Sequence, residues 1–319
     1  MGSATIERGV GEGGAFSHEA LFYQGEKDFV DRVGAFLKES VQAREPILVV
    51  VSARKVELLR SMLGRDAGAV RFADMADVGH NPARIIDAWQ GFVGEHAASG
   101  RPFRGVGEPI WATRSAEELV ECERHEALLN LAFAGAPAWQ LVCPYDTETL
   151  PPAVIEEACR NHPVLDDGAR RVSPAYREAG VIPAFDEPLP DPPVRPREFP
   201  FVAGDTLEPL RRFVGHQADV FGLPPSRRND LVFSANEVAT NSLVHGGGHG
   251  LLRMWPTDGA VVCEIRDQGF IEDPLVGRKR PSLEDTSGLG LWLANQLCDL
   301  VQVRSSPEGS AVRVHVSRL

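Results

Sequence analysis

The chain has 319 residues and a mass of 34.7 kDa, which exceeds a typical single domain and predicts two domains that each bury a core. Hydrophobic residues make up 43% of the chain and charged residues 24%, and no apolar run is long enough to cross a bilayer, so a soluble, cytoplasmic protein is expected. The formal net charge of -12 argues against direct binding of nucleic acid, which requires clustered Lys and Arg.

The first residues, 1–14, are polar and rich in glycine. They have neither the basic start nor the apolar stretch of a secretory signal. A disordered tail is therefore expected.

The cysteines are odd in number and never form a C-x-x-C pair. Their spacing indicates neither a disulfide framework nor a zinc site. They are expected to be reduced thiols in the core: Cys122, Cys143, Cys159, Cys263 and Cys298.

The N-terminal half alternates short apolar, β-branched runs with amphipathic stretches, which predicts an α/β layered domain. Continuous apolar runs are typical of parallel strands that are covered on both faces. This half has neither a G-x-x-x-x-G-K-[ST] phosphate loop nor a G-x-G-x-x-G motif, so it is expected to receive a signal. Strands are expected at 46–51, 70–72, 106–111 and 139–143, and helices at 54–63, 82–98, 116–133 and 152–159.

Four short segments of this half resemble the MEDS domain, a sensory module of regulators in methanogens and methylotrophs. The segments are His18–Tyr23, Glu45–Leu48, Cys143–Asp146 and Asn161–Pro163. The resemblance covers about residues 15–165 and implies a RecA-like α/β core that senses a small molecule or another signal. His18, Tyr23 and Tyr145 either line a pocket for that signal or serve as ordinary structural residues.

A proline-rich segment follows, with eight of the 24 prolines between Pro174 and Pro200. Such a segment cannot sustain a helix or a central strand. It predicts a semi-rigid linker at residues 166–200.

Residues 230–246 are apolar at helical spacing and end in glycine. Glu237 and Asn241 are four positions apart, so they share one face of the expected helix. A carboxylate can deprotonate a hydroxyl, and an amide oxygen suits Mg²⁺. The same spacing also occurs on solvated helices, so it is not specific by itself.

A strand-like run at 260–266 leads directly into Asp267-Gln268-Gly269. This order places an acceptor carboxylate at a sheet rim, next to a glycine that permits close approach. An adenine amino group would be a suitable partner. Farther on, Thr286-Ser287-Gly288-Leu289-Gly290 precedes a helix expected at 291–300, where free backbone amides would donate hydrogen bonds to a phosphate.

The three segments together resemble the GHKL (HATPase_c) ATPase superfamily. Glu237 and Asn241 match its N box, Asp267–Gly269 its G1 box and Gly288–Gly290 its G2 box. The resemblance covers residues 201–319 and implies a two-layer α/β sandwich with a mixed sheet, the Bergerat ATP-binding fold. It also implies ATP and Mg²⁺ as cofactors.

The resemblance assigns a role to each matched residue. Asp267 would bind adenine beside Gly269, supported by the hydroxyl of Ser310. Asn241 would help to hold Mg²⁺, and Glu237 would be the catalytic base. The phosphates would lie against Gly288, Leu289 and Gly290.

Two positions depart from the family pattern. Ile271 stands where a second G1 glycine is usual, and Thr286 or Ser287 replaces the glycine before the G2 pair. The lid is expected at Phe270–Asp285, where the basic triplet Arg278–Arg280 either contacts phosphates or is merely solvated.

The context favours one branch of the superfamily. No transducer domain is expected after the hairpin at 301–316, and the proline-rich linker stands where a sensor histidine kinase has its phosphoacceptor hairpin. The resemblance therefore points to the RsbW-like anti-sigma regulatory serine/threonine kinases. It implies a sigma factor and a STAS-like antagonist protein as partners, with a homodimer as one assembly. A non-catalytic ATP-gated switch and a histidine-kinase-like sensor that uses His125 remain the alternatives.

Overall fold

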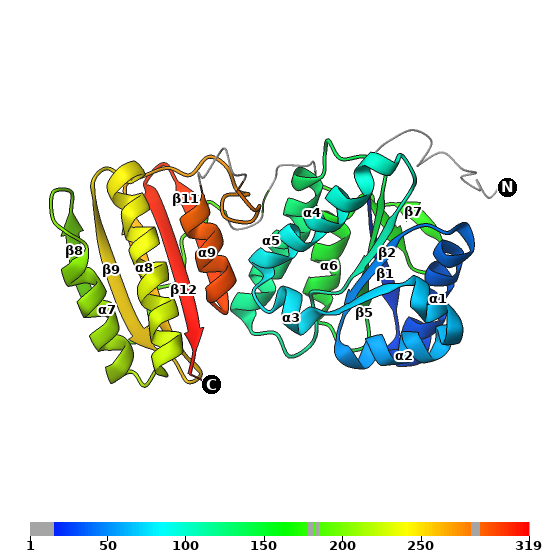
Figure 1. Ribbon diagram of the computed structural model, residues 1–319, viewed down its shortest axis with the longest axis horizontal. Coiled ribbons are helices and arrows are strands. Elements are labelled where there is room, and N and C mark those ends of the chain that lie inside the picture. Colours follow the sequence, from blue (N-terminus) through cyan, green and yellow to red (C-terminus); the bar gives the residue numbers. More distant parts are fainter. Residues whose placement is uncertain (1–15, 178–181, 183–184, 282–287, 319) are drawn as a thin grey trace. The chain divides into compact units, whose positions relative to one another are not determined.

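A computed structural model describes residues 16–177, 182, 185–281 and 288–318. The expected tail at 1–14 lies outside these residues. The chain divides into two compact units near residue 183, with residues 80–87 grouped with the second unit (Figure 1). Among the described helices, none combines the length and the apolar character that a membrane span requires.

The N-terminal unit contains a seven-stranded sheet in the order β3-β2-β4-β5-β1-β6-β7. Every pairing is parallel except that between β6 and β7. The strands are β1 (Ser17–Tyr23), β2 (Ile47–Val51), β3 (Arg71–Asp74), β4 (Arg104–Gly107), β5 (Gln140–Asp146), β6 (Val164–Asp166) and β7 (Arg170–Val172). The helices are α1 (Gly25–Ala43), α2 (Ala53–Leu63), α3 (Met75–Gly79), α4 (Ile85–His96), α5 (Ala116–Ala132) and α6 (Pro152–Asn161), with short 3-10 turns at Gly64–Ala69, Pro82–Arg84 and Ala97–Ser99.

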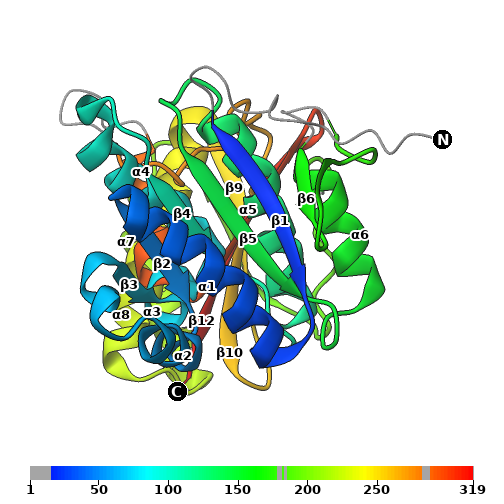
Figure 2. The same ribbon diagram turned by 90° about the vertical axis from the view of Figure 1, so that its right-hand side faces the viewer.

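Helices cover both faces of this sheet. Figures 1 and 2 show α1 and α2 against one face and α4, α5 and α6 on the other side. All five residues of β2 are buried, as expected for a parallel strand between two helical layers. The predicted RecA-like α/β class of this domain is confirmed.

The sequence analysis missed β1 and α1. In β1, His18 and Glu19 are buried although they are polar, and they interrupt the apolar run that would have marked a strand. Helix α1 buries Phe29, Val33 and Leu37, whose regular spacing was a usable signal.

The expected linker also starts too early. Residues 166–172 form the end of β6 and then β7, because Arg170 donates from Nε to Glu19 of β1 at 2.8 Å and fixes this hairpin to the sheet edge. At the other end, residues 197–200 already belong to β8.

The C-terminal unit is a five-stranded sheet, in the order β11-β12-β10-β9-β8, with helices on one face. Its elements are β8 (Arg197–Val202), α7 (Glu208–Val220), α8 (Pro225–His245), β9 (His249–Pro256), β10 (Ala260–Asp267), α9 (Leu289–Leu297), β11 (Leu300–Ser306) and β12 (Gly309–Ser317). Figure 1 shows α7, α8 and α9 side by side over the sheet. The predicted two-layer sandwich is confirmed.

The expectation of a mixed sheet was wrong, because all four strand pairings in this unit are antiparallel. The crossover through α9 does make β10 and β11 run in the same direction. However, β12 returns from its hairpin with β11 and lies between them, so these two strands never pair.

Part of the proline-rich segment packs against this unit and is not simply a spacer. Leu189 is buried, the carbonyl of Phe185 accepts from the Ser305 amide at 2.9 Å, and that of Pro190 accepts from Arg313 Nη2 at 2.6 Å. Residues 185–190 are therefore part of the folded C-terminal unit, and we refer to them as the strap.

Candidate functional site

A cavity of about 350 Å³ opens between α8, the end of β10, β12 and the start of α9. Five of the eight residues predicted for the site line it: Asn241, Asp267, Gly269, Gly288 and Ser310. Much of its remaining wall is apolar, from Val238, Ile271, Val276, Leu291 and Val312.

Asp267 is the last residue of β10, and it lies opposite Ser310 in the sheet register. Its Oδ1 accepts hydrogen bonds from Ser310 Oγ at 2.7 Å and from the Gly269 amide at 2.8 Å. Its Oδ2 accepts from Ser242 Oγ at 2.5 Å. Because each carboxylate oxygen can accept two bonds, Oδ2 retains one acceptor position.

Ser242 was missed by the sequence analysis. It lies on α8 next to Asn241 and is buried. Its spacing from Glu237 carries no signal, since the residue is recognisable only once α8 is packed against the end of β10.

Glycines let α8 end directly against the rim of the sheet. A Cβ on Gly269 would lie 2.8 Å from the Cα of Gly246 and 2.9 Å from the carbonyl oxygen of His245. A Cβ on Gly246 would lie 2.4 Å from the carboxyl carbon of Asp267. Any side chain at these two positions would push the helix end away from the aspartate.

Helix α9 begins at Leu289, with Gly288 as its N-cap in the left-handed region at φ 76°. The first amides of a helix have no partner within it and can bind an anion. Leu289 and Gly290 do not themselves line the cavity described above, and Thr286 and Ser287 lie outside the described residues.

Glu237 is half-buried on α8 and lies against the first turn of α9. A Cβ on Gly290 would be only 2.6 Å from Glu237 Oε2. Glu237 Oε1 accepts from Asn236 Nδ2 at 3.2 Å. The carboxylate is thus beside the cavity that Asn241 lines, and not on its wall.

The expected lid contributes Phe270, Ile271, Asp273 and Val276 to the cavity, while its residues 282–285 lie outside the described part of the chain. Arg278 is 4% exposed, which excludes a merely solvated side chain at that position. Arg280 lies over the ring of Trp292 at 5.3 Å.

Two family models match the chain. Residues 17–163 match MEDS, the methanogen/methylotroph, DcmR sensory domain, and residues 203–316 match the histidine kinase-like ATPase domain. The chain joins a MEDS domain to a histidine kinase-like ATPase domain. The search of the curated proteins found no match.

The MEDS domain has a cavity of its own, of about 440 Å³, which Tyr23 and Arg32 line. Tyr23 donates to Glu108 Oε1 at 2.6 Å, and Lys55 Nζ donates to Glu108 Oε2 at 2.7 Å. Burial raises the pKa of Tyr23, as does the nearby Glu108. These groups lie at the carboxyl ends of parallel strands, where α/β domains commonly bind ligands.

His18 and Tyr145, which were considered together with Tyr23, do not line this cavity. His125, the alternative phosphoacceptor, is 1% exposed on α5. A phosphoacceptor must be accessible to the nucleotide, so this burial argues against His125 in that role.

Proposed function

We propose that the ATPase domain transfers a phosphoryl group to a serine or threonine hydroxyl of a partner protein under the control of the MEDS domain. The observation that carries this proposal is the position of Glu237, whose carboxylate lies against the amide-rich first turn of α9 beside the cavity. That is where a general base for an incoming hydroxyl is needed.

The residues present fit ATP and Mg²⁺. The apolar wall suits an adenine ring, Asp267 Oδ2 keeps an acceptor position for an amino group, and Asn241 offers an amide oxygen to a metal ion. Mg-ATP would supply the phosphoryl group.

In the proposed mechanism, Asp267 would orient the nucleotide, and the first amides of α9 would donate to phosphate oxygens. Asn241 would hold the metal ion through its amide oxygen. Glu237 takes the proton of the attacking hydroxyl, while most of the rate acceleration comes from positioning and charge neutralisation.

The proposed partners are a STAS-like antagonist protein, which supplies the hydroxyl, and a sigma factor. The burial of His125 supports a hydroxyl on another protein over His125 as the phosphoacceptor. With those partners, the protein is an anti-sigma serine/threonine kinase.

One observation favours a second candidate, the non-catalytic ATP-gated switch. Glu237 accepts a hydrogen bond from Asn236 and does not line the cavity. A carboxylate held in this way would have to turn before it could act as a base.

Glu237→Gln distinguishes the two functions. Under the kinase proposal, this variant binds ATP as the wild type does but transfers phosphate about 10² to 10⁴ times more slowly, because it lacks a general base. Radiolabelled ATP and proteins co-purified from the native cell provide the assay, and calorimetry measures binding. Glu208→Gln, an exposed carboxylate on α7, is the matched control.

An unchanged transfer rate in Glu237→Gln would exclude Glu237 as the base. A wild-type protein that binds ATP but labels none of its co-purified partners would favour the switch.

A further inference from the structure

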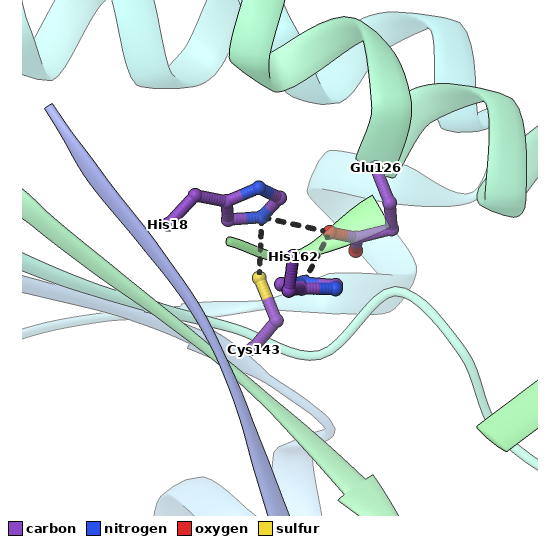
Figure 3. A group of neighbouring side chains, drawn as sticks. All are labelled: His18, Glu126, Cys143 and His162. Carbon is purple, nitrogen blue, oxygen red and sulfur yellow. Dashed lines mark hydrogen bonds and ion pairs between the residues drawn. The ribbon is translucent and has the colours of Figure 1, made fainter. Parts of the chain in front are cut away.

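Four side chains with metal-binding atoms meet in the interior of the MEDS domain (Figure 3). They are His18 of β1, Glu126 of α5, Cys143 of β5 and His162, which follows the last residue of α6. All four are buried, and one ligand atom from each lies within 4.8 Å of the others. The cluster is separate from the cavity at Tyr23 and from the nucleotide site.

Hydrogen bonds to the outer nitrogens fix both imidazole rings. His18 Nδ1 lies 3.1 Å from Asn130 Oδ1, and Asn130 is oriented by donating from Nδ2 to the Asn161 carbonyl at 2.8 Å. His162 Nδ1 lies 2.8 Å from the carbonyl oxygen of Ala158. This network assigns the proton of each neutral ring to Nδ1, so each Nε2 presents a lone pair to the cluster.

The ligand atoms that face one another in the cluster then lack enough protons to form hydrogen bonds with each other. Glu126 Oε2 is 3.1 Å from His18 Nε2 and 3.2 Å from His162 Nε2, and Cys143 Sγ is 3.4 Å from His18 Nε2. With both rings neutral, these contacts bring lone pairs together without a donor between carboxylate and imidazole. Either extra protons or a cation must resolve this arrangement.

The surroundings favour a cation. Glu126 Oε1 is buried and has no hydrogen-bond partner within the described part of the chain. The Tyr145 hydroxyl is also buried without a described partner, and its ring packs edge-on against His162 at 5.5 Å. A buried carboxylate with an unsatisfied oxygen is costly unless a positive charge offsets it.

The spacing also matches a tetrahedral ion. Ligand atoms about 2.0–2.3 Å from zinc are about 3.3–3.8 Å apart at tetrahedral angles. Three of the six ligand–ligand distances are 3.1–3.4 Å, and none exceeds 4.8 Å. Small side-chain shifts, outward for the short pairs and inward for any long one, therefore bring the four atoms to tetrahedral spacing. Two imidazoles, a thiolate and a carboxylate suit Zn²⁺ and are a poor set for Mg²⁺ or Ca²⁺, which prefer oxygen.

We propose that the MEDS domain binds one divalent transition-metal ion, with Zn²⁺ the best fit, through His18, Glu126, Cys143 and His162. The ligands come from two neighbouring strands and from two helix-derived positions, so the ion connects the sheet to the α5/α6 layer. A site closed by four protein ligands is of the structural kind. The ion would stabilise this side of the sensory domain.

Metal analysis of the full-length protein, purified without a polyhistidine tag, tests the proposal. About one zinc per chain is expected, with loss of the metal in Cys143→Ser and in His162→Gln. Cys159→Ser and His216→Gln replace a cysteine and a histidine outside the cluster, and they should retain it.

Cobalt substitution keeps the test decisive even if the ligand variants fail to fold. After chelation, Co²⁺ added to the wild type should give the intense visible bands of a tetrahedral site and a thiolate charge-transfer band that Cys143→Ser removes. Chelation should also lower the melting temperature. The proposal would be overturned by a folded wild type that takes up neither zinc nor cobalt. It would also be overturned if folded Cys143→Ser and His162→Gln variants bound as much metal as the Cys159→Ser and His216→Gln controls. The four side chains would then form a protonated hydrogen-bond network.

Discussion

Asp267 shows how one carboxylate can be held at the nucleotide site by its neighbours. Three donors fix it, namely the Ser310 hydroxyl, the Gly269 amide and the Ser242 hydroxyl. Two of these bonds go to Oδ1 and one goes to Oδ2, so both carboxylate oxygens must be acceptors. An amide in this place would turn one acceptor into a donor that faces another donor.

Asp267→Asn is therefore expected to reduce ATP affinity by at least about tenfold, since a hydrogen bond to a charged group contributes about 1.5–3 kcal/mol. Titration calorimetry measures the change. Ser242→Ala removes one supporting bond and should cause a smaller loss. Equal affinity in Asp267→Asn and the wild type would remove the adenine-binding role.

Glu123 on α5 has a pKa raised to about 7, first because it is partly buried and second because Glu157 is close. A carboxyl with a raised pKa in the folded state binds more protons there than in the unfolded chain. Folding stability therefore falls as the pH rises from about 4.5 to about 7 and stays at its lower level above that range.

Glu123→Gln removes this titration. The variant should gain stability relative to the wild type as the pH rises from 5 to 8. Urea unfolding at the two pH values provides the measurement, with the exposed Glu117 of the same helix, replaced by Gln, as the control. A constant difference between Glu123→Gln and wild type across this range would contradict the shifted pKa.

At the residue scale, the sequence predicted those site residues that belong to motifs of specific order and spacing. Examples are Asp267, Gly269 and Gly288, which the structure brings to one cavity. Ser242 and Glu126 could not be predicted in this way. Their neighbours come from distant parts of the chain, and only packing brings them together.

At the scale of elements, β10 carries a buried ion pair on the face of the sheet opposite the helices. Glu264 is fully buried, and its Oε2 accepts from Arg313 Nε at 3.0 Å and from Nη2 at 2.6 Å. Oε1 accepts from Arg266 Nε at 2.7 Å. The strand-like run at 260–266 predicted a strand but gave no sign that its polar face is covered.

Glu264→Ala should lower the free energy of unfolding by about 3–5 kcal/mol, because it leaves the buried guanidinium of Arg313 without its counter-charge. Chemical denaturation measures the loss. Glu198, an exposed carboxylate near Arg253 on the same sheet, is the control, and Glu198→Ala should cost at most about 1 kcal/mol. Similar losses in both variants would mean that Glu264 is not effectively buried.

At the scale of the whole molecule, length and motif order predicted two domains, and the chain forms two compact units. The proline pattern located the segment between them but not its structure. Proline excludes helices and central strands, yet it does not exclude packing. The strap at 185–190 therefore could not be distinguished from a free spacer in the sequence.

The strap gives a last prediction about where the ATPase domain begins. A fragment of residues 185–319 should be more stable than one of residues 191–319 by at least about 2 kcal/mol. The longer fragment keeps the buried side chain of Leu189 and the carbonyls that accept from Ser305 and Arg313, and burial of one leucine alone contributes about 1.5–3 kcal/mol.

Both fragments contain every residue that lines the nucleotide cavity, so calorimetry with ATP shows whether each is folded, and urea unfolding compares their stabilities. Leu189→Ala in the full chain should reproduce much of the difference, whereas equal stability of the two fragments would make residues 185–190 an ordinary linker.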